Sequence, residues 1–355
     1  MQRSALLLVL VCCGAAVADD NPFELVGHTK LRAVGQSYPD DSVFRDLAGS
    51  TSLDSAAELR LNASAKAAGW SFAADYQLLG IYSEFLPFGL PNDDRRLIDL
   101  TKIISEGSDS AVAHRLDRLW VGYAGEKFVL RAGRQALSWG NGLYFHPMDL
   151  VNPFDPETID TEYKTGDDMA YGQYLRENGD DLQAAAVFRR DPATGDVSSD
   201  QGTMALKYHG FAGEYEYDVL VAEHYGDTVL GLGGVGSIGG AVWRGDIVFT
   251  DAADETRVDL VANINYSWMW NDKNVTGSAE YSRNGDDRNY LAGSLMIEMS
   301  PLWTITPTVI ANLDDPSALF QFLTQYSLGD ELVFLGSLNI PTGGNGTEFG
   351  GPESG

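Results

Sequence analysis

Long segments in which apolar and polar residues alternate are the feature of this sequence that most restricts its fold. In residues 56–67 every odd position from Ala57 to Ala67 is apolar, and every position between carries a polar or charged side chain. After a tight turn at 68–69 the pattern resumes from Trp70 to Leu78. Side chains that alternate with a period of two lie on opposite faces of a β-strand, whereas a helix repeats every 3.6 residues. These segments therefore predict strands.

The alternation returns in the second half of the chain, at residues 214–221, 257–270, 275–282 and 303–312. Two architectures contain such strands. In a soluble sandwich the apolar face lies in a shared core, whereas in an outer-membrane barrel it faces lipid and the polar face lines the interior. No mature segment reaches eighteen continuous apolar residues, so we expect no helical membrane span.

Three features favour the barrel. The predicted strands run for about ten to fourteen residues, which is long for a soluble sheet and sufficient to cross a bilayer at a tilt. Short connections alternate with longer ones, of which the longest lie near 35–54, 84–111 and 139–167. Aromatic residues that would form interfacial girdles end the apolar faces: Trp70, Tyr215, Trp268, Trp270, Tyr281 and Trp303. We predict an all-β fold, a transmembrane antiparallel up-and-down barrel of about 16–18 strands.

The strand count leaves one position open. Counting along the alternation gives about seventeen strands, the last at 331–340, but single-chain bacterial barrels have even numbers. Either the count is wrong by one, or the chain stops inside its last outer loop and its C-terminal strand is missing. The second alternative would leave two unpaired edges, which lipid does not tolerate.

The first eighteen residues have the pattern of a secretory signal peptide. Arg3 precedes an apolar run from Leu6 to Val11, and Ala16-Val17-Ala18 matches a cleavage site. We predict removal of 1–18, with Cys12 and Cys13, which leaves 19–355 as one barrel without thiol chemistry. The full chain has 24 Lys and Arg against 51 Asp and Glu, a net charge of −27. This acidity argues against binding of nucleic acid.

The segment after the predicted strand 127–138 is rich in apolar residues but cannot pair as a strand. Pro147, Pro153 and Pro156 lack ladder donors. At membrane depth, irregular backbone is tolerated only where it lines a cavity or packs on protein. We therefore expect the loop 139–167 to fold back into the lumen and to narrow the pore.

This segment also resembles a known family. Residues 133–156 contain G-R-Q, then S-W-G-x-G, then P-M-D-L-x-N-P-F-x-P, and DTEYKTGDDMAYGQY follows at 160–174. The pattern is similar to that of outer-membrane porin-like barrels related to the alginate-export type, in which a G-R-Q strand leads to a W-G turn and an N-P-rich loop. The matching positions are Gly133, Arg134, Gln135, Trp139, Gly140, Asp149, Asn152, Pro153 and Pro156. The resemblance implies a porin-like barrel and does not specify the solute.

Ten residues are candidates for the pore lining and its constriction: Glu58, Arg60, Asp75, Arg131, Arg134, Gln135, Trp139, Asp149, Asn152 and Asp155. The polar strand faces contain both charges and lean acidic, which favours cations and disfavours export of an anionic polysaccharide. For Arg134 and Gln135 the preferred interpretation is structural, in which they bind loop carbonyls and hold the loop in place. Arg134 shares its parity with the apolar Leu130 and Ala132, so a bulge near Gly133 is needed to turn it inward.

Nothing in the sequence predicts a metal or catalytic site. The loop acids could offer oxygen ligands to Ca²⁺, but they lack EF-hand spacing, so solvated acids are the preferred interpretation and we expect no cofactor. They are Asp149, Asp155, Glu157, Asp160, Glu162, Asp167 and Asp168. The five histidines show no metal-ligand spacing, and no nucleophile pairs with a base, so we do not expect an enzyme.

These observations predict an outer-membrane channel for passive diffusion of small hydrophilic solutes, narrowed by the loop 139–167. The expected partners are outer-membrane lipid, the barrel-assembly machinery and the solutes themselves. Two alternatives stay open: a barrel for polymer export or surface assembly, and a non-conducting barrel anchor. Conductance separates the channel from both.

Overall fold

The structure is a computed structural model of the full chain. It describes residues 4–14, 22–38, 45, 49–84 and 90–350, with side chains from residue 22 onward. Within these residues the chain forms nineteen strands and a short 3-10 turn at Ser199–Gln201. The strands are β1 (Ser4–Gly14), β2 (Phe23–Ser37), β3 (Thr51–Ala67), β4 (Trp70–Tyr82), β5 (Thr101–Glu106), β6 (Ser110–Ala124), β7 (Phe128–Gln135), β8 (Asp167–Leu175), β9 (Asp181–Val187), β10 (Thr203–Ala212), β11 (Tyr215–His224), β12 (Asp227–Ile238), β13 (Ala241–Asp251), β14 (Thr256–Trp270), β15 (Lys273–Arg283), β16 (Asn289–Ser300), β17 (Trp303–Asn312), β18 (Ser317–Ser327) and β19 (Leu332–Thr342).

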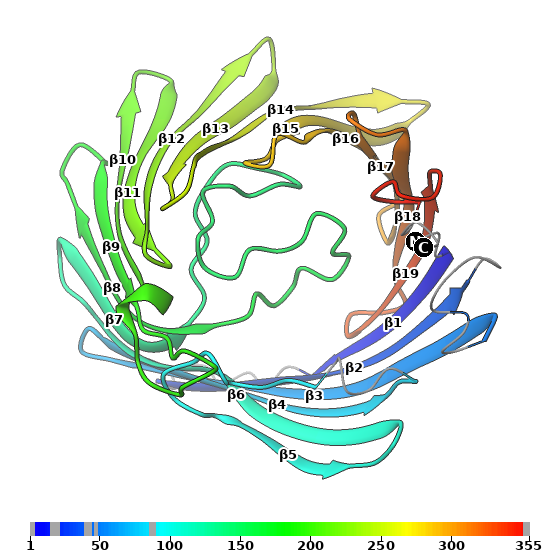
Figure 1. Ribbon diagram of the computed structural model, residues 1–355, viewed down its shortest axis with the longest axis horizontal. Helices are drawn as coiled ribbons and strands as arrows, with labels where there is room; N and C mark the ends of the chain where they lie inside the picture. Colours follow the sequence, from blue (N-terminus) through cyan, green and yellow to red (C-terminus); the bar gives the residue numbers. More distant parts are fainter. Residues whose placement is uncertain (1–3, 15–21, 39–44, 46–48, 85–89, 351–355) are drawn as a thin grey trace.

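Antiparallel pairing closes these strands into a ring (Figure 1). From β6 to β19 each strand pairs with the next in sequence, and β4 pairs directly with β6. β19 pairs with β1, and β1 pairs with β2, which completes the circle. β5 lies outside this order, on the half of β6 that β7 does not reach. The fold is therefore an all-β, antiparallel, up-and-down barrel with eighteen strands in its ring, within the predicted range.

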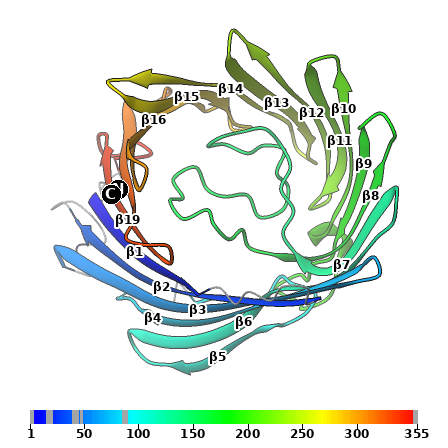
Figure 2. The same ribbon diagram turned by 180° about the vertical axis from the view of Figure 1, so that it is seen from behind.

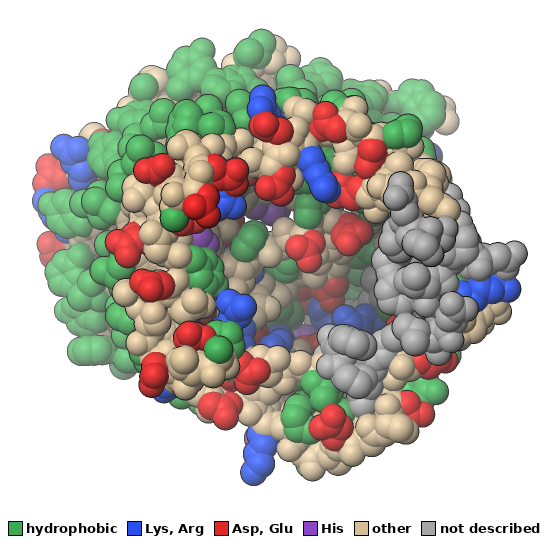
Figure 3. Space-filling model, viewed as in Figure 1, with side chains coloured by type: hydrophobic (Ala, Val, Ile, Leu, Met, Phe, Trp, Pro, Cys, Tyr) green, Lys and Arg blue, Asp and Glu red, His purple; other side chains and the backbone are tan. Residues whose placement is uncertain are grey.

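The barrel is polar inside and apolar outside, the reverse of a soluble domain. Along β3 and β4 the side chains of Leu59, Trp70 and Phe72 are exposed, whereas Arg60 and Gln77 are buried. The predicted girdle residues Trp70, Tyr215, Trp268, Trp270, Tyr281 and Trp303 all lie on the exposed face. Figure 3 shows apolar side chains over the outer wall and acidic ones around the mouth. Among the described residues no helix is long and apolar enough to cross a membrane. The apolar outer face and the polar inner face exclude the soluble-sandwich alternative.

The open strand position is filled by the start of the chain. Residues 4–14, which belong to the segment predicted to be a signal peptide, form β1 between β2 and β19. Without β1 the ring contains seventeen strands, which is the number counted from the alternation. The signal peptide itself stays a prediction.

Arg134 is buried, but no bulge interrupts β7 beside it. The register between β7 and β8 runs unbroken through Gly133, which pairs with Met169. Instead, Gly133 has a φ of 120°, and a Cβ there would lie 2.2 Å from the carbonyl oxygen of Leu119. The left-handed backbone at Gly133 thus stands in place of the predicted bulge, next to the buried Arg134. Only glycine fits this position without strain.

Candidate functional site: the lumen and its internal loop

The connection from β7 to β8 folds into the ring and crosses it (Figures 1 and 2). Its apolar residues find cover on the inner wall, because Trp139 and Met148 pack in one cluster with Tyr171 and Leu220. The indole Nε1 of Trp139 also donates to Gln183 Oε1 at 2.7 Å. This inner apolar patch on β8–β13 explains how a loop of this composition is buried inside a polar lumen.

On one side the loop is held by a carboxylate on β15. The backbone N–H groups of Leu143, Tyr144 and Phe145 donate to Glu280 at 2.6, 3.0 and 2.8 Å. Asn263 Nδ2 donates to the same carboxylate at 3.1 Å. An irregular loop has no strand partner for such N–H groups, so buried ones need another acceptor. Glu280 supplies it.

A second carboxylate repeats this arrangement on β13. Asn141 donates to Asp246 through its backbone N–H at 2.6 Å and through Nδ2 at 2.7 Å. A Cβ added at Gly140 would lie 3.0 Å from the same carboxylate. The φ of Gly140 is 92°, in the left-handed region. Asp246 and Glu280 together dock the first third of the loop on β13–β15.

The end of the loop contacts the opposite wall, on β2 and β3. The ring of Tyr163 stacks on His28 with centroids 5.2 Å apart, and the Arg60 guanidinium lies 4.0 Å from its centroid. Lys30 Nζ lies 2.9 Å from Asp160 and 2.6 Å from Glu162. The loop is thus attached to the wall on both sides of the lumen.

An ion pair also holds the loop to itself. Lys164 Nζ contacts Asp149 and donates to the Leu137 carbonyl at 2.6 Å and to Ser138 Oγ at 3.0 Å. Burial lowers the pKa of Lys164 and raises the pKa of Asp149, and the attraction between the two opposes both shifts. Lys164 thus joins the end of the loop to its middle at Asp149 and to its start at Leu137 and Ser138.

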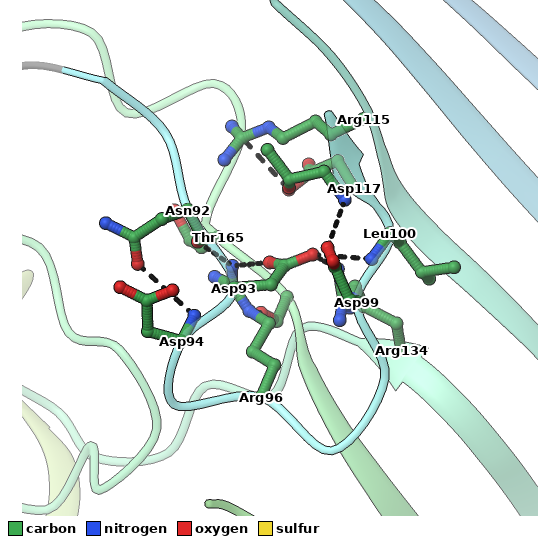
Figure 4. Close-up of polar contacts among 12 residues, drawn as sticks. Asn92, Asp93, Asp94, Arg96, Asp99, Leu100, Arg115, Asp117, Arg134 and Thr165 are labelled. Atoms are coloured by element: carbon green, nitrogen blue, oxygen red, sulfur yellow. Dashed lines mark hydrogen bonds and ion pairs between the residues drawn. The ribbon is translucent and has the colours of Figure 1, made fainter. Parts of the chain in front are cut away.

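A second, shorter segment, residues 90–100 between β4 and β5, binds Arg134 at the end of β7 (Figure 4). Arg134 Nη1 donates to Asp93 at 2.9 Å, and Arg134 Nε donates to Asp168 at 3.0 Å. Arg96 also pairs with Asp93, whose other oxygen accepts the Leu100 N–H at 2.8 Å. Burial alone would raise the pKa of Asp93, but these hydrogen bonds outweigh it and lower the pKa to about 2.

Another group of charges lies on the wall formed by β3, β4 and β6. Asp117 lies 3.0 Å from Arg60, 3.1 Å from Arg118 and 3.8 Å from Arg115. Arg60 also pairs with Glu58 at 3.1 Å. With Asp75 beside Arg60 and Arg118, the three guanidinium groups are matched by three carboxylates, so this charged wall carries both signs. It faces a loop that carries Asp160 and Glu162 on the same side of the lumen.

The ten predicted residues fall into separate groups. Glu58, Arg60 and Asp75 lie on the charged wall, where Asp75 pairs across the strands with Asn62. Arg134 and Gln135 are both 2% exposed and donate to backbone: Arg134 to Ile98 O at 2.5 Å and Gln135 to Met169 O at 3.4 Å. Neither carbonyl belongs to the loop 139–167, since Ile98 lies before β5 and Met169 lies in β8, so the role of the pair in holding that loop stays a prediction.

The other predicted residues lie in the loop or beside it. Trp139 and Asp149 are buried, and Asn152 donates to Thr165 O at 3.3 Å. Asp155 is exposed and lines a cavity. Arg131 lies apart from the rest, with its guanidinium 4.9 Å from the centroid of the Tyr171 ring.

Sequence reasoning missed several residues that organise the lumen: Lys30, Asp93, Asp117, Tyr163, Lys164, Asp246 and Glu280. One feature of the sequence indicates where on the inner wall the loop packs. Residues 219–222, Val-Leu-Val-Ala, are apolar on both strand faces, so the inner face there needs cover. The seven loop acids considered for Ca²⁺ are dispersed. Five of them form ion pairs: Asp160 and Glu162 with Lys30, Asp149 with Lys164, Asp167 with Arg189 and Asp168 with Arg134. Across the described part of the chain, no group of three or more His, Cys, Asp or Glu could hold a metal ion.

Comparison with known proteins finds similar chains among solved structures. No family model matches the chain, and no curated protein matches it. Among solved structures, two mutants of the porin of Rhodopseudomonas blastica superpose with a TM-score of 0.45 at 8% identity, over 96% of this chain and 99% of theirs. A likeness this weak leaves the function open. The fold rests on the strand pairing described above.

Proposed function

We propose that this protein is an outer-membrane channel through which small hydrophilic solutes diffuse passively, with a lumen narrowed by the loop 139–167. The observation that carries the proposal is the closed ring with apolar residues outside and charged residues inside. Such a surface is stable in lipid, and such an interior is stable when hydrated. A ring of this strand number leaves an aqueous channel unless it is plugged.

Other features support an outer-membrane location and a transport function. The predicted signal peptide would export the chain, and the barrel-assembly machinery would insert it. The resemblance of residues 133–174 to porin-like barrels related to the alginate-export type agrees with a transport function. The lumen walls carry ionised groups bound in pairs to one another, and we assign no catalytic role to them. The protein is a channel in this proposal, not an enzyme.

Single-channel recording in planar bilayers tests the proposal. The wild-type protein should give discrete steps whose size rises with salt concentration. In the test variant, residues 141–162 are replaced by a short Gly-Ser linker, which keeps Trp139 and Lys164 and should enlarge the steps severalfold. As a control, the same linker replaces the exposed turn 191–196 between β9 and β10, and conductance should stay unchanged.

The same recordings measure charge preference. Because the chain carries 51 acidic residues against 24 basic ones, the reversal potential in a KCl gradient should indicate preference for K⁺. A folded barrel that inserts but stays silent in both wild-type and loop-replaced forms would contradict a diffusion channel. That result would favour an anchor or an export component.

A further inference from the structure

The lumen contains a partly open chamber beside the internal loop. It has a volume of about 440 Å³ and lies between the loop, the strands β16–β19 and the segment that follows β19. The chamber is lined by Gln36, Phe145, Asp155, Pro156, Glu157, Tyr290, Ile310, Leu319, Asn339, Pro341, Glu348 and Phe349. A volume of this size is within the usual range for small-molecule sites.

The floor of the chamber is an exception to the polarity of the barrel. Tyr290, Ile310 and Leu319 project inward from β16, β17 and β18 and are only 5%, 2% and 4% exposed. The loop covers part of this floor, with the Phe145 ring 5.0 Å from that of Tyr290. Phe349 adds apolar surface from the segment after β19. The covering is incomplete, so apolar side chains of the floor line an open space beside the loop.

The rim of the chamber is negatively charged. It carries the carboxylates of Asp155, Glu157 and Glu348, and its described lining includes no Lys or Arg. Glu348 is fixed in place, since it accepts hydrogen bonds from the Tyr290 hydroxyl at 2.9 Å and from Asn312 Nδ2 at 2.6 Å. Arg288 lies 3.8 Å from Glu348, but its side chain is 54% exposed, so water screens this contact.

We propose that this chamber binds small organic ammonium ions that carry an apolar body. The apolar part would lie on Ile310 and Leu319, and the ammonium group would lie between the rim carboxylates and the aromatic faces. A cation gains from both the carboxylates and the rings, a neutral analogue gains from neither, and an anion is repelled. Binding at this site does not depend on whether the barrel conducts, so it goes beyond the proposed channel function.

Three probes of similar shape and different charge test the site: 2-phenylethylammonium, 2-phenylethanol and 3-phenylpropionate. Each is titrated by calorimetry into the folded, detergent-solubilised protein. We expect 2-phenylethylammonium to bind at least tenfold more tightly than 2-phenylethanol, and 3-phenylpropionate not to bind. Equal affinity for the ammonium and the alcohol would overturn the proposal, as would no binding of the ammonium ion.

Variants then locate the site. The double variant Asp155→Asn with Glu157→Gln removes two rim charges and should weaken 2-phenylethylammonium at least tenfold. Asp254→Asn, in the exposed connection between β13 and β14, removes one charge elsewhere and should leave the affinity unchanged. Leu319→Phe fills the floor and should also abolish binding, with Ile310→Phe as a second filling variant if the first does not fold. Unchanged affinity in the rim variant or in a folded filling variant would overturn the assignment.

Discussion

At the scale of single residues, the lumen is organised by acceptors that replace strand pairing. Glu280 is the clearest case, because one carboxylate satisfies three consecutive backbone donors of a loop. It is 1% exposed, so water does not substitute for it. The carboxylate accepts the hydrogen bonds that a neighbouring strand would accept from a paired segment. Loop position should therefore depend on it more than on any apolar contact.

Glu280→Ala should release the loop 139–167 from β15. Leaving buried N–H groups without acceptors costs about 1–3 kcal/mol for each group, which exceeds what one apolar contact restores. In detergent, limited proteolysis with chymotrypsin should cut at Tyr144 or Phe145 at least tenfold faster than in the wild type. Glu298→Ala is the matched control, since Glu298 lies on the neighbouring strand β16 and accepts an exposed hydrogen bond from Asn274. Equal cleavage rates in all three proteins would show that Glu280 does not hold the loop.

At the scale of elements, the segment 90–100 is held by charge, whereas the loop 139–167 is held by both charge and apolar packing. Asp93 is the centre of this attachment, with Arg134, Arg96 and the Leu100 N–H around it. Its pKa is lowered to about 2 in the folded protein. The attachment should therefore have an acid limit.

Acid should release the segment 90–100. A carboxyl whose folded pKa is depressed contributes stability that is complete above its unfolded pKa and lost as pH falls toward the folded value. For Asp93 the window runs from about 4 down to about 2, and the contribution is on the order of 2 kcal/mol. An acid-active protease should cut this segment faster at pH 2 than at pH 4. In Asp93→Asn the segment should be cut quickly at both pH values; a wild-type rate that does not change with pH would contradict the assignment.

The elements also show what the sequence could predict. Strands such as β3, β4 and β14 follow from alternation, because that pattern depends only on neighbours in sequence. The contacts of Glu280 with residues 143–145 and of Arg134 with Asp93 join parts of the chain that are far apart in the sequence. Alternation gives the face of each residue and not its partner across the lumen. The loop was therefore correctly expected inside the barrel, but its anchors were not.

At the scale of the whole molecule, closure of the ring depends on β1, which lies within the predicted signal peptide. β1 is antiparallel to both β2 and β19, so those two strands run in the same direction. If the signal peptide 1–18 is removed, β2 and β19 become facing edges that could join only as a parallel pair. Unpaired edges are costly in lipid, and parallel pairs are less stable per residue.

The seam between β2 and β19 should therefore be the weakest part of the mature barrel. We expect the intact mass of protein from outer membranes to show a chain that begins at Asp19. Hydrogen exchange at neutral pH should then be at least tenfold faster for amides of Phe23–Ser37 and Leu332–Thr342 than for the paired amides of β14 and β15. The β14–β15 pair is the internal control, because eleven residue pairs join it far from the seam. A mature mass that includes residues 4–14 would contradict removal of the signal peptide, and β1 would then be a permanent strand of the barrel.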